Sequence, residues 1–186
     1  MAEAVDDLRA GQDAAADERV RRNRRLGFTI AIGLLILDQA VKLFVTYILQ
    51  LKQRGADGID LLPVFKLVWT ENRGVSMGFL NAGSETERWL LVVLTGAISA
   101  FVAAWLWRER RRDDSIALAM VLGGALGNII DRIRLGYVVD YADLHFGDIH
   151  PFLVFNVGDA AITIGVLLLL VRALLTRERK APLEDK

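Results

Sequence analysis

Four long apolar stretches constrain the fold of this 186-residue chain more than any other feature. The hydrocarbon core of a bilayer is about 30 Å thick, so a spanning helix needs about 20 mostly apolar residues. The stretches run over residues 26–49, 89–107, 115–133 and 155–175. Helices buried in soluble proteins rarely need so many consecutive apolar residues. The sequence therefore predicts a polytopic membrane protein with four transmembrane helices.

Composition excludes several other classes of protein. The formal net charge is +0, so no overall basic field attracts nucleic acid, and we expect no nucleic-acid partner. The chain has no cysteine, which excludes disulfide bonds, thiolate metal sites and a cysteine nucleophile.

Basic clusters predict the orientation in the membrane. Short loops rich in Lys and Arg mark the cytoplasmic side. Such clusters precede the first stretch, separate the second from the third and follow the fourth: Arg19, Arg21, Arg22, Arg24, Arg25, Arg108, Arg110, Arg111, Arg112, Arg177, Arg179 and Lys180. We therefore expect both termini in the cytoplasm and two segments, about 50–88 and 134–154, outside.

The ends of the chain differ from its middle. Residues 1–25 begin with an acidic, alanine-rich run without apolar periodicity, which predicts a disordered cytoplasmic tail. Residues 26–176 then form a single membrane domain, and 177–186 form a second short cytoplasmic tail.

The first outer segment has the pattern of extended structure. Residues 59–70 are β-prone and partly alternating, and Pro63 indicates an edge strand or an interrupted one. Gly74, Gly78 and Gly83 follow as turn signals. The pattern predicts a small extended platform at the membrane surface.

Polar side chains occur where the bilayer makes them costly. An ionisable residue at the centre of a span costs at least about 2.5–3.5 kcal/mol. Asp38 and Lys42 are spaced i, i+4, so they share one face of the first span and can pair. The others lie at the outer ends of the last two spans or between them: Asn128, Asp131, Arg132, Asp140, Asn156 and Asp159. Ion pairs that only lock helix packing explain Asp38–Lys42 and Asp131–Arg132 equally well.

Asp140 and Asp159 are the candidates for chemistry. The last two spans are antiparallel, so their outer ends can meet and bring these carboxylates together although they are distant in sequence. Two carboxylates in a partly dry site do not both ionise easily, so one keeps a proton. Such a pair can activate a water and protonate a leaving amine, as peptide hydrolysis requires. The alternative for both residues is ordinary solvated charge at the interface.

Four stretches together resemble the lipoprotein signal peptidases, also called type II signal peptidases. They are DQAVK (Asp38–Lys42), NRGVSMGF (Asn72–Phe79), GGALGNIIDRIRLGYVVDY (Gly123–Tyr141) and FNVGDAAITIG (Phe155–Gly165). They occur in the family's order within residues 28–175. The family consists of bacterial membrane aspartyl proteases with four spans and a small extracellular, or periplasmic, β-platform.

The resemblance implies a function and a site. These enzymes remove signal peptides from prolipoproteins in the cell (inner) membrane and cut before a diacylglyceryl-modified cysteine. The implied catalytic pair is Asp140 and Asp159, near the outer face. Polar residues of the family's active site or its supports match here at Asn72, Gly74, Asn128, Asp131, Arg132, Asn156, Asp38 and Lys42. The implied partners are modified prolipoproteins and membrane lipids, with a monomeric enzyme and neither cofactor nor metal.

Two positions depart from the family's pattern. Gly158 precedes the second catalytic aspartate where alanine is usual, and we expect it to loosen the first helical turn at a cost of at most about 1 kcal/mol. Val75 and Ser76 stand where smaller residues are common. Neither change removes a chemical group.

Two other functions compete with the protease. The stretch DLHFGDIH holds Asp143, His145, Asp148 and His150, whose side chains can ligate zinc, although a solvated loop has the same composition. A small transporter or proton relay would also use intramembrane carboxylates. Against the transporter, the charges gather at one face, and the sequence has no inverted repeat.

Overall fold

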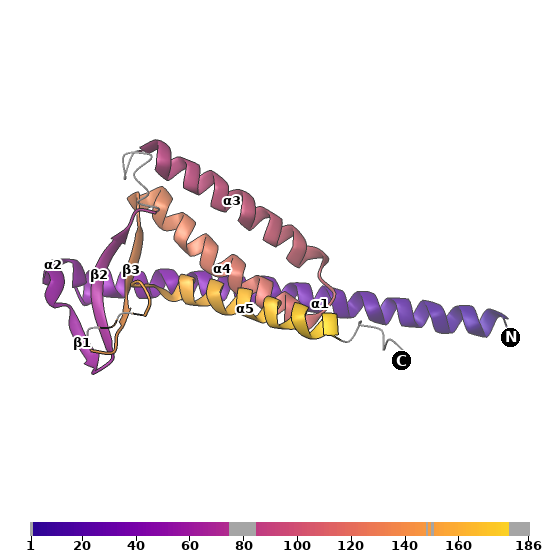
Figure 1. Ribbon diagram of the computed structural model, residues 1–186. Helices are drawn as coiled ribbons and strands as arrows, with labels where there is room; N and C mark the ends of the chain where they lie inside the picture. The colour runs from indigo at the N-terminus through magenta and orange to yellow at the C-terminus, as the bar shows by residue number, and fades with distance from the viewer. Residues whose placement is uncertain (1, 75–84, 148, 150, 179–186) are drawn as a thin grey trace, which may run out of the picture.

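The computed structural model describes residues 2–74, 85–147, 149 and 151–178. Long helices form a bundle, and a small sheet lies at one of its ends (Figure 1). The elements are α1 (Ala2–Leu43), a π-helical turn (Phe44–Ile48), α2 (Leu51–Arg54), a 3₁₀ turn (Gly55–Asp57), β1 (Ile59–Leu62), β2 (Phe65–Asn72), α3 (Glu85–Arg108), α4 (Arg112–Leu135), β3 (Val138–Leu144) and α5 (Val157–Glu178).

Four helices are long and apolar enough to cross a bilayer. These candidate spans are Ala14–Ile48, Glu85–Arg108, Arg112–Leu135 and Val157–Leu175. They contain nearly all of the four predicted stretches, so the predicted four-helix membrane architecture is confirmed. More than half of the α4 span is buried, whereas α1, α3 and α5 expose many large apolar side chains. Helix α4 is therefore the centre of the bundle, and the others present lipid-facing surfaces.

Glycines allow α4 to approach its neighbours closely. A Cβ atom at Gly123 would meet the Ala31 carbonyl oxygen of α1 at 2.6 Å. At Gly124 it would collide with the backbone of Gly158 in α5. Small residues let backbones approach in membranes, where packing rather than the hydrophobic effect drives helix association. These contacts set the distances between the helices that carry the polar residues.

The sheet contains three antiparallel strands in the order β1-β2-β3. The predicted extended structure over residues 59–70 is confirmed, and Pro63 lies in the turn of the β1–β2 hairpin, where Leu62 pairs with Phe65. The third strand, β3, was not predicted. It lies beside β2, with Asp140 opposite Thr70, and Ala142 also bridges to Phe155 before α5.

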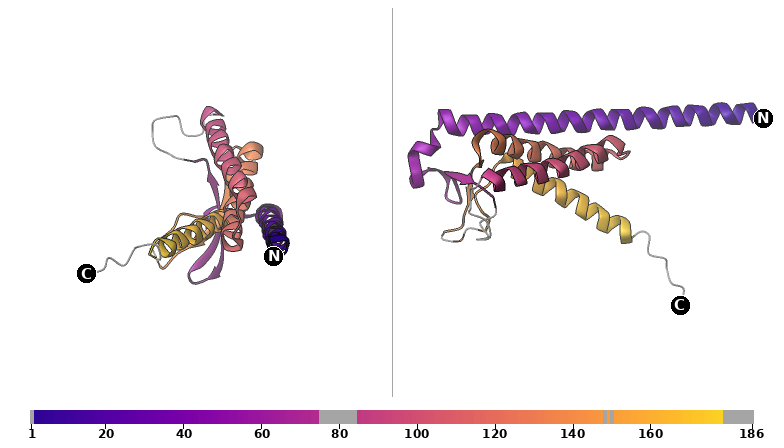
Figure 2. Two further views of the ribbon diagram at one scale, coloured as in Figure 1. Left: turned by 90° about the vertical axis from the view of Figure 1, so that its right-hand side faces the viewer. Right: turned by 90° about the horizontal axis from the view of Figure 1, so that it is seen from above.

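Residues 2–25 differ from the prediction of a disordered tail. In the structure they are helical and continue into the membrane-spanning part of α1, and Figure 2 shows this helix running beyond the end of the bundle. Alanine has the highest helix propensity, and a preformed helix removes the cost of nucleation. High helix propensity and continuity with the spanning part of α1 thus favour a helix here, although the sequence shows no apolar periodicity. The second predicted tail is described only to Glu178, the last residue of α5.

Gly124→Ala tests the close approach of α4 and α5. The added methyl group would force the Gly158 backbone away, so we expect a loss of about 1–3 kcal/mol of stability. Gly96→Ala is the matched control, because no atom lies within 4 Å of its added Cβ. Thermal unfolding of both variants in the same detergent measures the difference. Equal melting temperatures for the two variants would contradict the packing argument.

Candidate active site

A buried ion cluster joins α1 to α4 near the sheet. Lys42 Nζ lies 2.8 Å from Asp38 Oδ2 and 2.8 Å from Asp131 Oδ2. The exposed fractions of these three side chains are 4% or less. A buried charge without a partner costs several kcal/mol, so the three residues depend on one another.

The carboxylates of this cluster also hold the backbone of neighbouring elements. Asp38 Oδ1 accepts a hydrogen bond from the Gly158 amide of α5 at 2.9 Å. Asp131 Oδ2 accepts one from the Val139 amide of β3 at 3.2 Å. The cluster therefore fixes the starts of α5 and β3, the two elements that carry Asp159 and Asp140.

Lys42 determines how the Asn128 amide is oriented. Its ammonium group donates to Asn128 Oδ1 at 2.9 Å, and an ammonium can only donate. The amide nitrogen of Asn128 therefore points the other way and donates to Asp159 Oδ1 at 2.8 Å. The buried cation thus acts on the candidate catalytic carboxylate through an asparagine.

Asn156 caps α5 and links both candidate carboxylates. Its side-chain Oδ1 accepts a hydrogen bond from the backbone amide of Asp159 at 2.9 Å, and its own backbone amide donates to Asp159 Oδ2 at 3.1 Å. This reciprocal pair satisfies two donors at the helix start. Because Oδ1 is used as an acceptor, Nδ2 is free to donate to Asp140 Oδ1 at 2.6 Å.

A glycine turn orients Asn72 in the same manner. Gly74 has φ +101°, a conformation that glycine adopts without strain, and its amide donates to Asn72 Oδ1 at 3.0 Å. Asn72 Nδ2 then donates to Asp140 Oδ2 at 2.9 Å. Each oxygen of Asp140 thus accepts from one oriented amide.

The electrostatic environment raises the pKa of Asp140 to about 6. Burial is the largest cause, since only 1% of the residue is exposed. The negative charge of Asp159 raises the pKa further, while the hydrogen bonds from Asn72 and Asn156 lower it. Asp140 therefore holds its proton to a higher pH than an ordinary aspartate, beside a second carboxylate.

Arg132 is a cation near both candidate carboxylates that has an unused hydrogen-bond donor. It lies within electrostatic range of Asp159, Asp140 and Asp131. Its buried Nε has no hydrogen-bond partner among the residues that the structure describes. Nε can therefore form a further hydrogen bond without breaking an existing one.

The predicted site residues come together at one place. Asp140, Asp159, Asn72, Asn128 and Asn156 form one hydrogen-bonded group. Asp38, Lys42 and Asp131 lie behind it, and Gly74 and Arg132 lie beside it. Two interacting carboxylates with fixed donors can share a proton and activate a water.

Three features of this site were not predicted from the sequence. Gln39 donates to Asp131 Oδ1 at 3.0 Å and to the Gly127 carbonyl at 3.2 Å. The Tyr141 hydroxyl accepts from the Val157 amide at 3.3 Å. A Cβ at Gly127 would collide with the Asp38 carboxylate. Gln39 was detectable as a further polar residue inside an apolar span.

The role of Gly158 in the first turn of α5 also differs from the prediction. We expected this glycine to loosen the turn that carries Asp159. In the structure its amide donates to Asp38, and a Cβ there would lie 2.9 Å from the Gly124 carbonyl oxygen. The glycine thus serves close packing against α4.

The predicted zinc alternative falls partly outside the described chain. His145 Nδ1 lies 3.4 Å from Asp143 Oδ2, but Asp148 and His150 are not among the described residues, nor are Val75, Ser76, Gly78 and Gly83. Within the described part, no three His, Asp or Glu side chains are grouped so that they could hold a metal.

Comparison with known proteins identifies relatives over most of the chain. The lipoprotein signal peptidase of Rhizorhabdus wittichii is 57% identical over 88% of this chain and 94% of its own length. That of Sphingopyxis alaskensis is 51% identical over 87% of this chain and 92% of its own.

Solved structures and a family model agree with these relatives. A structure described as a bacterial membrane enzyme, solved at 1.9 Å resolution, superposes with a TM-score of 0.68 at 25% identity and covers 87% of this chain and 94% of its own. The model of signal peptidase (SPase) II matches residues 30–175. Because this match covers most of the chain and includes its polar centre, the chain belongs to the signal peptidase II family.

Proposed function

We propose that this protein is an aspartic endopeptidase that removes signal peptides from prolipoproteins, cutting before the diacylglyceryl-modified cysteine, with Asp140 and Asp159 as catalytic residues. The observation that carries this proposal is the bridge through Asn156, which donates to both carboxylates. The family supports the substrate class, because the relatives are named lipoprotein signal peptidases. The comparisons give no support to the transporter alternative.

The two carboxylates have different environments and therefore different roles. Asp159 lies in the first turn of α5, where the helix dipole and the Asn156 amide favour a negative charge. Asp140 is almost fully buried, and its pKa is raised to about 6. Asp159 is thus the base that activates water, and Asp140 carries the shared proton.

The reaction proceeds with one water and no cofactor. Asp159 takes a proton from the water as the water oxygen attacks the scissile carbonyl, and Asp140 gives its proton to the carbonyl oxygen. The resulting tetrahedral diol collapses when Asp159 returns its proton to the leaving amine and Asp140 takes a hydroxyl proton. The C–N bond breaks, and both carboxylates return to their starting states.

Substrate binding uses the groups that the carboxylates do not occupy. The amides of Asn72, Asn128 and Asn156 already donate to Asp140 or Asp159. Arg132 retains a buried Nε without a partner among the described residues, so we assign it the contact with substrate carbonyl oxygen. A charged donor placed there polarises the carbonyl and stabilises the partial negative charge that develops on its oxygen before Asp140 has transferred its proton.

The distribution of arginine supports an active site on the outer face of the cell (inner) membrane. The arginines of residues 19–25 in α1 and those between α3 and α4 belong to the end of the bundle opposite the sheet. By the positive-inside rule that end is cytoplasmic, and both termini with it. The lipid-modified cysteine then enters from the outer leaflet. One chain supplies both carboxylates, so a monomer suffices.

Asp140→Asn and Asp159→Asn test the catalytic pair. Each variant removes one partner of the proton exchange, so we expect cleavage to fall by at least about 10³-fold, at the upper end of acid–base effects. The matched control is Asp60→Asn, a carboxylate of the same sheet that is 74% exposed. A gel-shift assay with a diacylated precursor measures the rate. Full processing by either catalytic variant would exclude the assignment.

Asn72→Ala tests the electrostatics through the pH profile. Rising pH removes the proton of Asp140, so kcat/KM declines above an apparent pKa near 6 in the wild type. The Asn72 hydrogen bond lowers the pKa of Asp140, so its removal raises that pKa and moves the decline to higher pH. The rate below pH 6 serves as the internal reference. An unchanged or lowered apparent pKa would contradict this role.

A further inference from the structure

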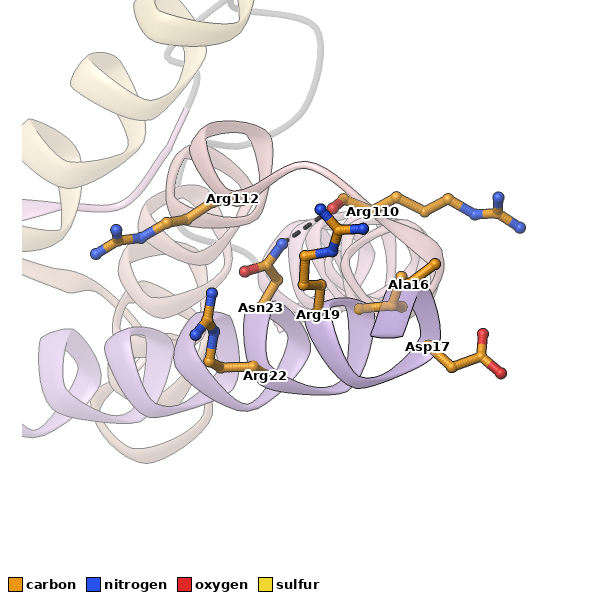
Figure 3. A pocket seen from close by; sticks show the side chains of 8 residues that line it. Ala16, Asp17, Arg19, Arg22, Asn23, Arg110 and Arg112 are labelled. Carbon is orange, nitrogen blue, oxygen red and sulfur yellow. Dashed lines mark hydrogen bonds between the residues drawn. The ribbon is translucent and has the colours of Figure 1, made fainter. Parts of the chain in front are cut away.

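A cavity lies at the end of the bundle opposite the candidate active site. It has a volume of about 400 Å³ and lies between residues 16–23 of α1 and the connection from α3 to α4. Figure 3 shows Arg19 and Arg22 rising from α1 on either side of Asn23, with Arg112 on the facing element. Two separate parts of the chain therefore line this open cavity, which we call the arginine pocket.

Asn23 holds the two sides of the arginine pocket together. Its side chain is 7% exposed, and its Nδ2 donates to the Arg110 carbonyl oxygen at 2.9 Å. One turn further along α1, a Cβ at Gly27 would lie 2.6 Å from Leu106 and 3.3 Å from the Ser115 carbonyl oxygen. This tight packing gives the pocket a fixed base.

The charge of the pocket is strongly positive. Its lining contains Arg19, Arg22, Arg110 and Arg112 but a single acidic residue, Asp17, so the net charge is +3. Among the side chains that the structure describes, these arginines take part in no ion pair. Figure 3 shows the side chains of Arg19 and Arg22 beside Asn23, whereas those of Arg110 and Arg112 extend away from it in opposite directions. The positive charges that line the cavity repel each other, and a bound anion would relieve that repulsion.

The surroundings place the pocket at the depth of lipid headgroups. Trp105 and Trp107 at the same end of α3 are 43% and 56% exposed, as expected of aromatic residues at a membrane interface. The guanidinium of Arg24 lies 4.0 Å from the centre of the Trp107 ring. Beyond this level the exposed side chains of α1 and α3 are mostly apolar, including Ile32, Ile36 and Phe101. A phosphate in the pocket would thus have apolar protein surface beside its acyl chains.

We propose that the arginine pocket binds the phosphate-bearing headgroup of an anionic phospholipid, from the leaflet opposite the candidate active site. Guanidinium groups match phosphate oxygens through paired hydrogen bonds, and basic pockets between membrane helices bind such headgroups. The site is separate from Asp140 and Asp159, so the proposal stands or falls independently of the proteolytic mechanism.

The double variant Arg22→Gln/Arg112→Gln tests the pocket. Native mass spectrometry of the purified full chain measures bound phosphatidylglycerol, with phosphatidylcholine of the same acyl chains as the neutral reference. Each basic residue near a membrane surface contributes about 1 kcal/mol, so we expect phosphatidylglycerol binding to weaken by about tenfold or more. Phosphatidylcholine retention and the rate of precursor cleavage in zwitterionic detergent should not change.

Arg21→Gln/Arg108→Gln is the matched control, since both residues are exposed, have the same charge and lie on α1 and α3 outside the pocket. The control should bind phosphatidylglycerol like the wild type. Equal losses in both double variants would mean general attraction to an anionic surface and would overturn the proposal. Competition by inorganic phosphate at the affinity of the lipid would overturn the assignment to a lipid.

A gain of affinity provides a test that does not depend on removing arginines. Asp17→Asn removes the acidic side chain of the lining and should tighten phosphatidylglycerol binding several-fold, by about the contribution of one surface charge. Glu18→Gln is the matched control, because it removes the same charge from an exposed neighbouring residue that does not line the pocket. The same affinity for the two single variants would contradict a discrete pocket.

Discussion

The ammonium group of Lys42 is the interaction on which the rest of the site depends. It contacts Asp38, Asp131 and Asn128 at 2.8–2.9 Å, and these contacts use all three of its hydrogens. In a membrane-embedded position such a group persists only when every partner is satisfied. The positive charge also decides which end of the Asn128 amide faces Asp159. A buried ion cluster thus sets the geometry of the proposed catalytic carboxylate, Asp159.

Each side-chain amide that donates to Asp140 or Asp159 is oriented by a second hydrogen bond. Lys42 binds the oxygen of Asn128, the Asp159 amide binds that of Asn156, and the Gly74 amide binds that of Asn72. In every case the amide nitrogen is left to face a carboxylate. Because these orientations exist before substrate arrives, the site would need little rearrangement during the proposed reaction. The glycines of α4 serve the same purpose by allowing α5 and α1 to come close enough.

Much of this arrangement could be predicted from the sequence because the bilayer imposes simple rules. Length and apolarity predicted the four spans, and the cost of buried charge drew attention to Asp38, Lys42, Asp131 and Asp159. Strand β3 was missed because it is buried over most of its length, so no alternation marks it. The helix over residues 2–25 was missed because its cause is propensity and continuity with α1. The amide orientations depend on contacts across as many as 86 positions, such as Lys42 with Asn128, which no local pattern reveals.

The central claim is that Asp140 holds a proton which Asp159 helps to retain. Infrared difference spectra recorded during a pH titration report protonated carboxyl groups directly. The account predicts a carboxyl band that titrates near pH 6, that is absent in Asp140→Asn, and that moves to lower pH in Asp159→Asn, because the neighbouring charge raises the pKa of Asp140. A band that persists without Asp140, or that titrates at the same pH without Asp159, would contradict the shared proton.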